Sequence, residues 1–291
     1  MTKCIAMAVV LLCVLVNSLD AHGLLRRLLC PPRVRCAPLP LAIADVGLRD
    51  TLEGRVSFVG ELPKLRNLEE VMYAHQDNKH ILKGPKADRL DPTWKIDPHT
   101  KGVANVCVYL KRPADGRLPI HADDKIRKAP VVLDAPFCVF VPHMVAFYPV
   151  WNDGKDIGLT GQKLILRNSA PVPQSVRIIV NPRFNRVDPA ISDFVHGRTE
   201  FEFTPNVQRL PVVIQSNFHV WMQSYVWVFD HPYFAITKTD GTFFIPRVPA
   251  GMEVQVMAWH ESQGWLFTSA GKTMTLKQGK NVLDFEISVP K

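Results

Sequence analysis

Short apolar runs, each ended within a few residues by glycine or proline, recur along most of this 291-residue sequence. Residues 54–59 alternate in polarity before Gly60, residues 103–110 form a continuous apolar run, and residues 131–150 contain further runs interrupted by prolines. The chain has 24 prolines, which remove backbone donors and interrupt long helices. Residues 65–76 are the one segment with a passable helical pattern. The sequence therefore predicts an all-β protein.

The later runs predict a sandwich followed by a smaller β-unit. Residues 163–167 and 199–203 alternate in polarity, and residues 176–180 are rich in β-branched side chains. Short strands at this spacing are typical of a Greek-key sandwich. From residue 233 the pattern becomes more compact, with the turn Thr239-Asp240-Gly241 between two apolar runs. An Asp-Gly pair in this setting predicts a β-hairpin.

The N-terminal residues are typical of an exported protein. Lys3 precedes an apolar run that ends at Val16, and small or polar residues follow. We interpret residues 1–22 as a signal peptide, with an uncleaved membrane anchor as the alternative. Residues 23–50, rich in arginine and proline, are interpreted as a basic linker. Lys3 and the four arginines from Arg26 to Arg35, less Asp20, contribute +4 of the net charge of +8, so the rest of the chain is only mildly basic. We therefore expect no nucleic-acid surface and, after cleavage, no integral membrane span.

Three side chains that can bind metal follow one another at a spacing of three residues. Ser216, His219 and Met222 come after the apolar residues 211–214 and before the aromatic residues 225–229, which places them on a loop between two strands. In blue-copper sites such a loop supplies a thiolate, an imidazole and a weak axial methionine. Serine holds the thiolate position here, and its neutral hydroxyl is not a soft, charged ligand.

Five segments of the sequence resemble one protein family. They are GVANVCVYL from Gly102, CVFVPH from Cys138, GQKLILRNSAPV from Gly161, SNFHVWM from Ser216 and DHPYFAITKTDGTFFIPRVPAG from Asp230. The chain resembles bacterial secreted proteins in which a cupredoxin-like domain precedes a carboxypeptidase regulatory-like domain. The resemblance implies a cupredoxin-like Greek-key β-sandwich at residues 51–232. It also implies a small transthyretin-like (carboxypeptidase regulatory-like) β-sandwich at residues 233–291.

The same resemblance implies a copper site that has lost part of its ligand set. Metal-binding members of such families carry a histidine soon after Asn-Ser-x-Pro-Val and the motif Cys-x-x-His-x-x-Met later. In this sequence the histidine position falls at Gln174 or its neighbours Pro173 and Ser175, and Ser216 stands at the cysteine position. His219 and Met222 remain as vestigial metal ligands. His143, from the Val-Pro-His segment, is expected close behind the site. A degenerate type 1 copper site is therefore predicted.

The other histidines show none of the spacings that metal sites favour. His75, His80, His99 and His121 are spread over a long polar segment, and we interpret them as solvated surface residues. In a protein exported through a signal peptide, cysteines are able to form disulfides. Of the four cysteines after the signal, Cys107 and Cys138 either pair with each other or stay as buried free thiols, and the spacing leaves both possibilities open.

No catalytic motif is found in the sequence, and neither a phosphate-binding loop nor a nucleophile elbow is present. We interpret His260 and Glu261 as structural, because adjacent residues on a strand point to opposite faces. The expected function is that of an exported, non-enzymatic binding or scaffold protein without a cofactor, whose partner is an unknown envelope or secreted protein.

Two alternatives to this expectation remain. The first is a copper protein for electron transfer or copper handling that uses His219 and Met222. The second is an envelope- or carbohydrate-binding module in which exposed tryptophans provide stacking platforms. The tryptophans considered for this role are Trp151, Trp221, Trp227 and Trp265.

Overall fold

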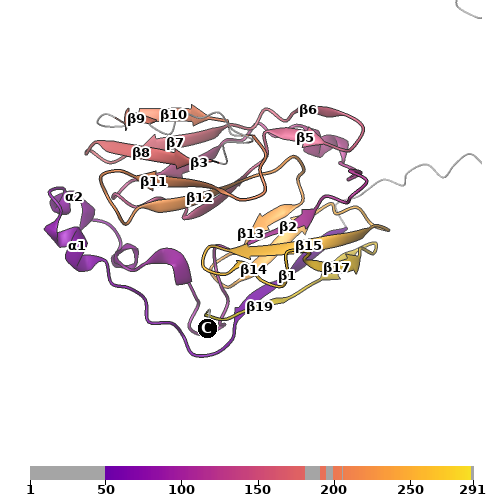
Figure 1. Cartoon of the computed structure of the whole chain (residues 1–291), viewed down its shortest axis with the longest axis horizontal. Coiled ribbons are helices and arrows are strands. Elements are labelled where there is room, and N and C mark those ends of the chain that lie inside the picture. Colours follow the sequence, from indigo (N-terminus) through magenta and orange to yellow (C-terminus); the bar gives the residue numbers. More distant parts are fainter. Residues whose placement is uncertain (1–49, 181–190, 195–198, 205, 290–291) are drawn as a thin grey trace, which may run out of the picture. The chain divides into compact units, whose positions relative to one another are not determined.

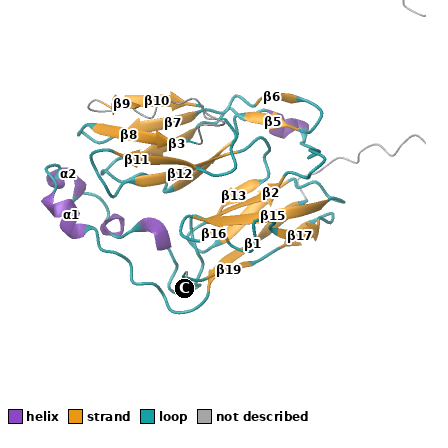
Figure 2. Ribbon diagram, in the orientation of Figure 1, coloured by secondary structure: helices purple, strands orange, loops and turns teal. Residues whose placement is uncertain are grey.

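The structure is a computed structural model that describes residues 50–180, 191–194, 199–204 and 206–289 (Figure 1). The proposed signal peptide, Cys30, Cys36 and nearly all of the basic linker lie outside the described residues. Strands dominate the described part, and this confirms the all-β prediction (Figure 2). None of the described helices has the length and apolar character that crossing a membrane requires. The helices are α1 (Glu69–Ala74), α2 (Asn78–Ile81), and the 3-10 helices η1 (Lys86–Arg89), η2 (Pro92–Trp94) and η3 (Ala122–Lys125).

Two facing sheets form what we call the first sandwich. One sheet has the strand order β4-β12-β11-β8-β9, and the other has the order β10-β7-β3. Alternate residues of the strands, such as Leu164 and Leu166 in one sheet and Val212 and Ile214 in the other, are buried in one shared apolar core. The bounds are β3 (Val131–Asp134), β4 (Met144–Phe147), β7 (Leu164–Asn168), β8 (Gln174–Ile179), β9 (Ile191–Phe194), β10 (Thr199–Phe203), β11 (Val212–Ser216) and β12 (Gln223–Val228).

Two further sheets form the second sandwich. One has the order β14-β1-β18, with β19 also paired to β1, and the other has the order β13-β2-β15-β16, with β17 also paired to β15. Their inward residues share a second apolar core. The bounds are β1 (Thr51–Phe58), β2 (Cys107–Lys111), β13 (Phe234–Ile236), β14 (Thr242–Pro246), β15 (Glu253–His260), β16 (Gly264–Trp265), β17 (Lys272–Thr275), β18 (Lys280–Val282) and β19 (Phe285–Ile287). A separate two-stranded ribbon joins β5 (Val150–Asn152) to β6 (Ile157–Leu159).

The strand pairing differs from the sequence expectation at both ends of the chain. β1 and β2 were assigned to the first domain, residues 51–232. β1 instead pairs with β14, β18 and β19, and β2 pairs with β13 and β15. Strands that precede residue 232 therefore pair with strands that follow it. A boundary between residues 232 and 233 does not divide the strands into two independent sets. Local sequence patterns identify strands, but long-range hydrogen bonds choose their partners.

The hairpin expected around Asp240 is wrong in its pairing. The turn itself forms, with the Gly241 N–H donating to the Lys238 carbonyl over 2.9 Å. The strands on either side then enter different sheets, because β13 pairs with β2 and β14 pairs with β1. The helix expected at residues 65–76 is shorter in the structure and consists of α1. The strand expected at residues 103–110 begins later, because β2 starts at Cys107.

Candidate functional site

The loop between β11 and β12 carries the residues that the sequence singled out. The Met222 N–H donates to the His219 carbonyl over 2.8 Å, and the Ser216 N–H donates to the Met222 carbonyl over 3.1 Å, which closes the loop tightly. The Ser216 hydroxyl oxygen accepts the N–H groups of Phe218 and His219 at 3.1 and 3.0 Å. Ser216, where the resemblance expects a cysteine, therefore acts as an anchor for the loop backbone.

Gln174 at the start of β8 lies beside this loop, because β8 pairs with β11. Its side chain is 1% exposed. Gln174 Oε1 is 3.1 Å from His219 Nδ1, and Gln174 Nε2 donates to Cys138 Sγ at 3.2 Å. The structure thus brings Gln174, Ser216 and His219 together and links them by hydrogen bonds.

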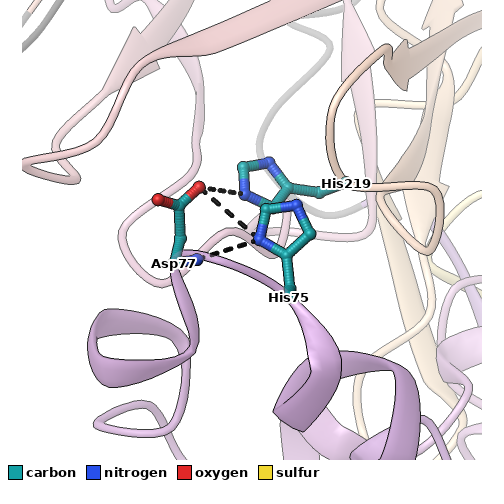
Figure 3. Close-up of side chains that lie close together, drawn as sticks. All are labelled: His75, Asp77 and His219. Atoms are coloured by element: carbon teal, nitrogen blue, oxygen red, sulfur yellow. Dashed lines mark hydrogen bonds and ion pairs between the residues drawn. The ribbon is translucent and has the colours of Figure 1, made fainter.

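The far side of the His219 ring meets a turn that is distant in the sequence. His219 Nε2 is 3.2 Å from Asp77 Oδ2, and the same oxygen is 3.6 Å from His75 Nδ1 (Figure 3). Asp77 and His75 belong to the turn between α1 and α2, where the Asp77 N–H donates to His75 Nδ1 over 3.1 Å. The rings of His75 and His219 have centroids 4.6 Å apart.

Burial controls the protonation of this cluster. It lowers the pKa of His219 to about 4, the nearby His75 adds to the decrease, and the hydrogen bond with Asp77 opposes it. Burial also raises the pKa of the Cys138 thiol to about 12. At neutral pH the site therefore contains a neutral imidazole and a protonated thiol. A neutral imidazole is a competent metal ligand, whereas a protonated thiol is not.

Met222 and His143 lie in different environments. Met222 is buried in the apolar core of the first sandwich. His143 pairs through Nε2 with Glu261 at 2.5 Å, and both side chains are largely buried. His143 thus has a carboxylate partner of its own, and its proposed role behind the copper site stays a prediction. His260 instead bonds to the Thr93 carbonyl at 2.9 Å, so adjacent His260 and Glu261 have separate partners, as expected for neighbours on a strand.

An apolar cleft of about 370 Å³ opens beside the loop. A volume of this size falls in the range typical of small-molecule sites. Trp221 and Met222, which follow His219 on the loop, line the cleft, and His143 contributes a polar group to it. The cleft is also lined by Leu68, Leu90, Trp94 and Phe140.

The residues at the positions expected for copper ligands do not fit a type 1 centre. Such a centre needs a thiolate, and the hydroxyl of Ser216 is already engaged by two backbone N–H groups. Cys138, the nearby sulfur, is a buried free thiol with a raised pKa, and Cys107 is also buried and free. We therefore derive no redox step through copper at this position.

Sequence reasoning missed His75 and Asp77, and the interpretation of His75 as solvated surface is wrong. The sequence signal is a His-x-Asp turn, and the same turn recurs at His121 and Asp123, where the Asp123 N–H donates to His121 Nδ1 over 3.2 Å. Spacing alone cannot distinguish the two turns. The turn at His75 differs because His219, which lies 142 residues after Asp77 in the sequence, contacts it.

Comparisons with known proteins give little further information. No family model matches the sequence, and no curated protein matches it. One solved structure, a purple cupredoxin from Nitrosopumilus maritimus, is similar with 14% sequence identity and a TM-score of 0.25, covering 34% of this chain and 99% of that chain. The similarity to a cupredoxin is therefore weak and partial, and nothing about the site depends on it.

Proposed function

We propose that this protein is an exported, non-enzymatic binding or scaffold protein built on a cupredoxin-like sandwich whose type 1 copper site has been replaced by hydrogen bonds. The observation that carries the proposal is the state of the two former ligand positions. Ser216 accepts two backbone N–H groups, and Gln174 faces His219 Nδ1 at 3.1 Å. Both residues now hold the loop in place, and neither supplies sulfur or a second imidazole.

A binding role is supported by the cleft beside the loop. Its walls are mostly apolar, and Leu90 at its rim has 38% of its surface exposed. Apolar clefts with a few polar groups are common sites for small molecules and for side chains of protein partners. The partner expected from the N-terminal signal is an envelope or secreted protein.

The carbohydrate-binding alternative finds less support in the tryptophan side chains. Trp221 and Trp227 are buried. Lys125 Nζ lies 3.9 Å from the centre of the Trp151 ring, and the Arg209 guanidinium lies 5.2 Å from that of Trp265. Among the described residues, these four rings do not form an exposed row on which sugars could stack.

Copper titration tests the loss of the type 1 site. We expect the wild-type protein to give no intense visible absorption with Cu²⁺, because the site lacks a thiolate. The double variant Ser216→Cys/Gln174→His should gain such a band, since it restores two ligand types beside His219. Ser269→Cys, a cysteine at an exposed position that lines a different cavity from the loop, is the control for copper bound by any added thiol. An intense band in the wild-type protein would overturn the proposal in favour of a copper protein.

The binding role is tested by placing a charge in the cleft. Leu90→Glu should abolish capture of a partner from envelope extracts, because a carboxylate at the apolar wall loses hydration on binding. Leu62, which is 42% exposed and does not line the cleft, provides the matched control Leu62→Glu, which should capture the partner as the wild type does. Equal capture by both variants would exclude the cleft as the binding surface.

A further inference from the structure

Three donor atoms from two distant segments converge on one point near the cleft. His75 and Asp77 come from the turn between α1 and α2, and His219 comes from the loop after β11. One ligand atom from each residue lies within 4.8 Å of the other two. Figure 3 shows one ring nitrogen of His75 and one of His219 next to the same Asp77 carboxylate.

We propose that His75, Asp77 and His219 form a mononuclear site for a divalent transition-metal ion, for which Zn²⁺ is the best match. Tetrahedral Zn²⁺ with bonds of roughly 2.1 Å places its ligand atoms about 3.4 Å apart. Asp77 Oδ2 lies 3.2 Å from His219 Nε2 and 3.6 Å from His75 Nδ1, which brackets this spacing. All three ligand atoms lie within 4.8 Å of one another, so the side chains would draw together around the bound ion.

His219 presents a lone pair to the site in one of its two neutral tautomers. With the proton on Nδ1, His219 donates to Gln174 Oε1 over 3.1 Å, and the Nε2 lone pair faces the Asp77 carboxylate at 3.2 Å. Metal-bound histidines commonly have their other ring N–H fixed by such an acceptor. With the proton on Nε2, that nitrogen donates to Asp77 instead, and a metal ion would displace the proton and select the first tautomer.

His75 completes the set from a more accessible position. Its Nδ1, the ring nitrogen nearest the Asp77 carboxylate, accepts the Asp77 N–H and therefore has a lone pair. A metal ion would compete with that N–H for the lone pair. The side chains of His75 and Asp77 are each 18% exposed, whereas His219 is fully buried. The ion therefore has an entry route from the side of the α1–α2 turn.

The donor set selects the class of ion. Two imidazole nitrogens and one carboxylate oxygen suit Zn²⁺ and similar borderline ions, whereas Ca²⁺ and Mg²⁺ prefer oxygen alone and Cu⁺ prefers sulfur. Three protein ligands leave a fourth position for water or for a donor from a bound partner. The site shares only His219 with the degenerate copper position, so it goes beyond the proposed function.

The second His-x-Asp turn provides an internal control. His121 and Asp123 repeat the local geometry of His75 and Asp77, with the ring nitrogen 3.5 Å from the carboxylate oxygen instead of 3.6 Å. Among the described residues, the turn at His121 is not part of a three-donor cluster. If the local turn alone bound metal, both turns would do so equally.

Calorimetric titration of the tag-free protein with Zn²⁺ tests the site, with Co²⁺ as a spectroscopic probe. We expect one ion per chain and visible Co²⁺ bands of the intensity typical of tetrahedral coordination. His75→Ala and Asp77→Asn should each weaken Zn²⁺ binding by more than about 100-fold, because removing a ligand exceeds the roughly 10- to 100-fold effect of removing an outer partner. His121→Ala should bind as the wild type does. Bound Zn²⁺ should also raise the thermal unfolding midpoint.

Several outcomes would overturn the site. They are the absence of Zn²⁺ binding at micromolar concentration, unchanged binding in His75→Ala, and equal losses in His75→Ala and His121→Ala. His75 and Asp77 are partly exposed, so substituting them should not disrupt the apolar core. Circular dichroism verifies that the variants are folded. A failed Zn²⁺ titration leaves the copper and cleft experiments unaffected, because those measure thiolate absorption and partner capture.

Discussion

At the scale of single residues, buried histidines carry most of the polar chemistry described here. His219 is held between Gln174 and Asp77, and His260 contacts the Thr93 carbonyl. His231 is 4% exposed, and its Nδ1 accepts the Tyr233 N–H over 3.2 Å. Each ring nitrogen that accepts a backbone N–H requires an unprotonated lone pair, so acid acts directly on such contacts.

His231 should make the protein less stable in acid. Burial lowers its pKa to about 4 from 6.5, the charge of Arg112 adds to this, and Asp230 opposes it. The unfolded chain therefore binds this proton at a higher pH than the folded one. The contribution of neutral His231 to the free energy of unfolding is fully present above about pH 6.5. It is lost as the pH falls toward 4, and the loss amounts to roughly 3 kcal/mol. Chemical denaturation at several pH values should show that the free energy of unfolding depends less on pH in His231→Gln than in the wild type. An unchanged pH dependence would contradict the assignment of this acid sensitivity to His231.

At the scale of elements, the turn between β13 and β14 is enclosed by the backbones of two other segments of the chain. Its Asp-Gly pair forms the predicted turn, but the flanking strands join different sheets. The reason lies in a close approach: a Cβ atom on Gly102 would lie 1.9 Å from the Asp240 carbonyl oxygen. The Val56 N–H donates to the Gly241 carbonyl over 2.9 Å, so β1 and the segment before β2 enclose the turn.

Gly102→Ala should therefore destabilise the fold more than an alanine at a strained but open glycine. The added Cβ must displace the backbone of the turn, and overpacking of this kind costs about 1–3 kcal/mol or more. Gly279 has a φ of +84° and no atom within 4 Å of a built Cβ, so Gly279→Ala should cost only the roughly 1–2 kcal/mol of the left-handed conformation. Urea denaturation of both variants gives the comparison. A smaller loss for Gly102→Ala would refute the close approach.

At the scale of the whole described molecule, an aromatic cluster joins the two sandwiches. Trp227 on β12 has its ring centre 5.3 Å from that of Tyr109 on β2 and 5.4 Å from that of Trp259 on β15. Phe229 stacks beside Trp227 with centroids 5.8 Å apart. The two sandwiches therefore share buried side chains, and we expect them to unfold in one cooperative transition.

Two substitutions of Trp227 separate its shape from its polar atom. Trp227→Ala should lower the free energy of unfolding by about 3–5 kcal/mol, because it opens a large cavity between the sandwiches. Trp227→Phe should cost far less. It keeps an aromatic ring and removes an indole N–H that has no hydrogen-bond partner among the described residues. Thermal unfolding followed by circular dichroism measures both, and equal losses would contradict the view that the filled volume determines the contribution of Trp227.

Part of the candidate site followed from the order of residues in the sequence. Ser216 and His219 lie on one loop, and their spacing predicted that they would share one site. Gln174 was placed beside them by the resemblance, and the pairing of β8 with β11 brings it there. His75 and Asp77 could not be found in this way, because their turn resembles the one at His121 and acquires its distinct character only from a residue far along the chain.

The sequence by itself determined the all-β character, the approximate positions of most strands and the lack of a thiolate at Ser216, because these depend on local backbone preferences and on residue identity. The tertiary structure decided which strands pair, so that β1 and β2 join the C-terminal sheets. It also decided that His75, Asp77 and His219 meet. Such meetings depend on long-range hydrogen bonds and burial, which local sequence patterns do not encode.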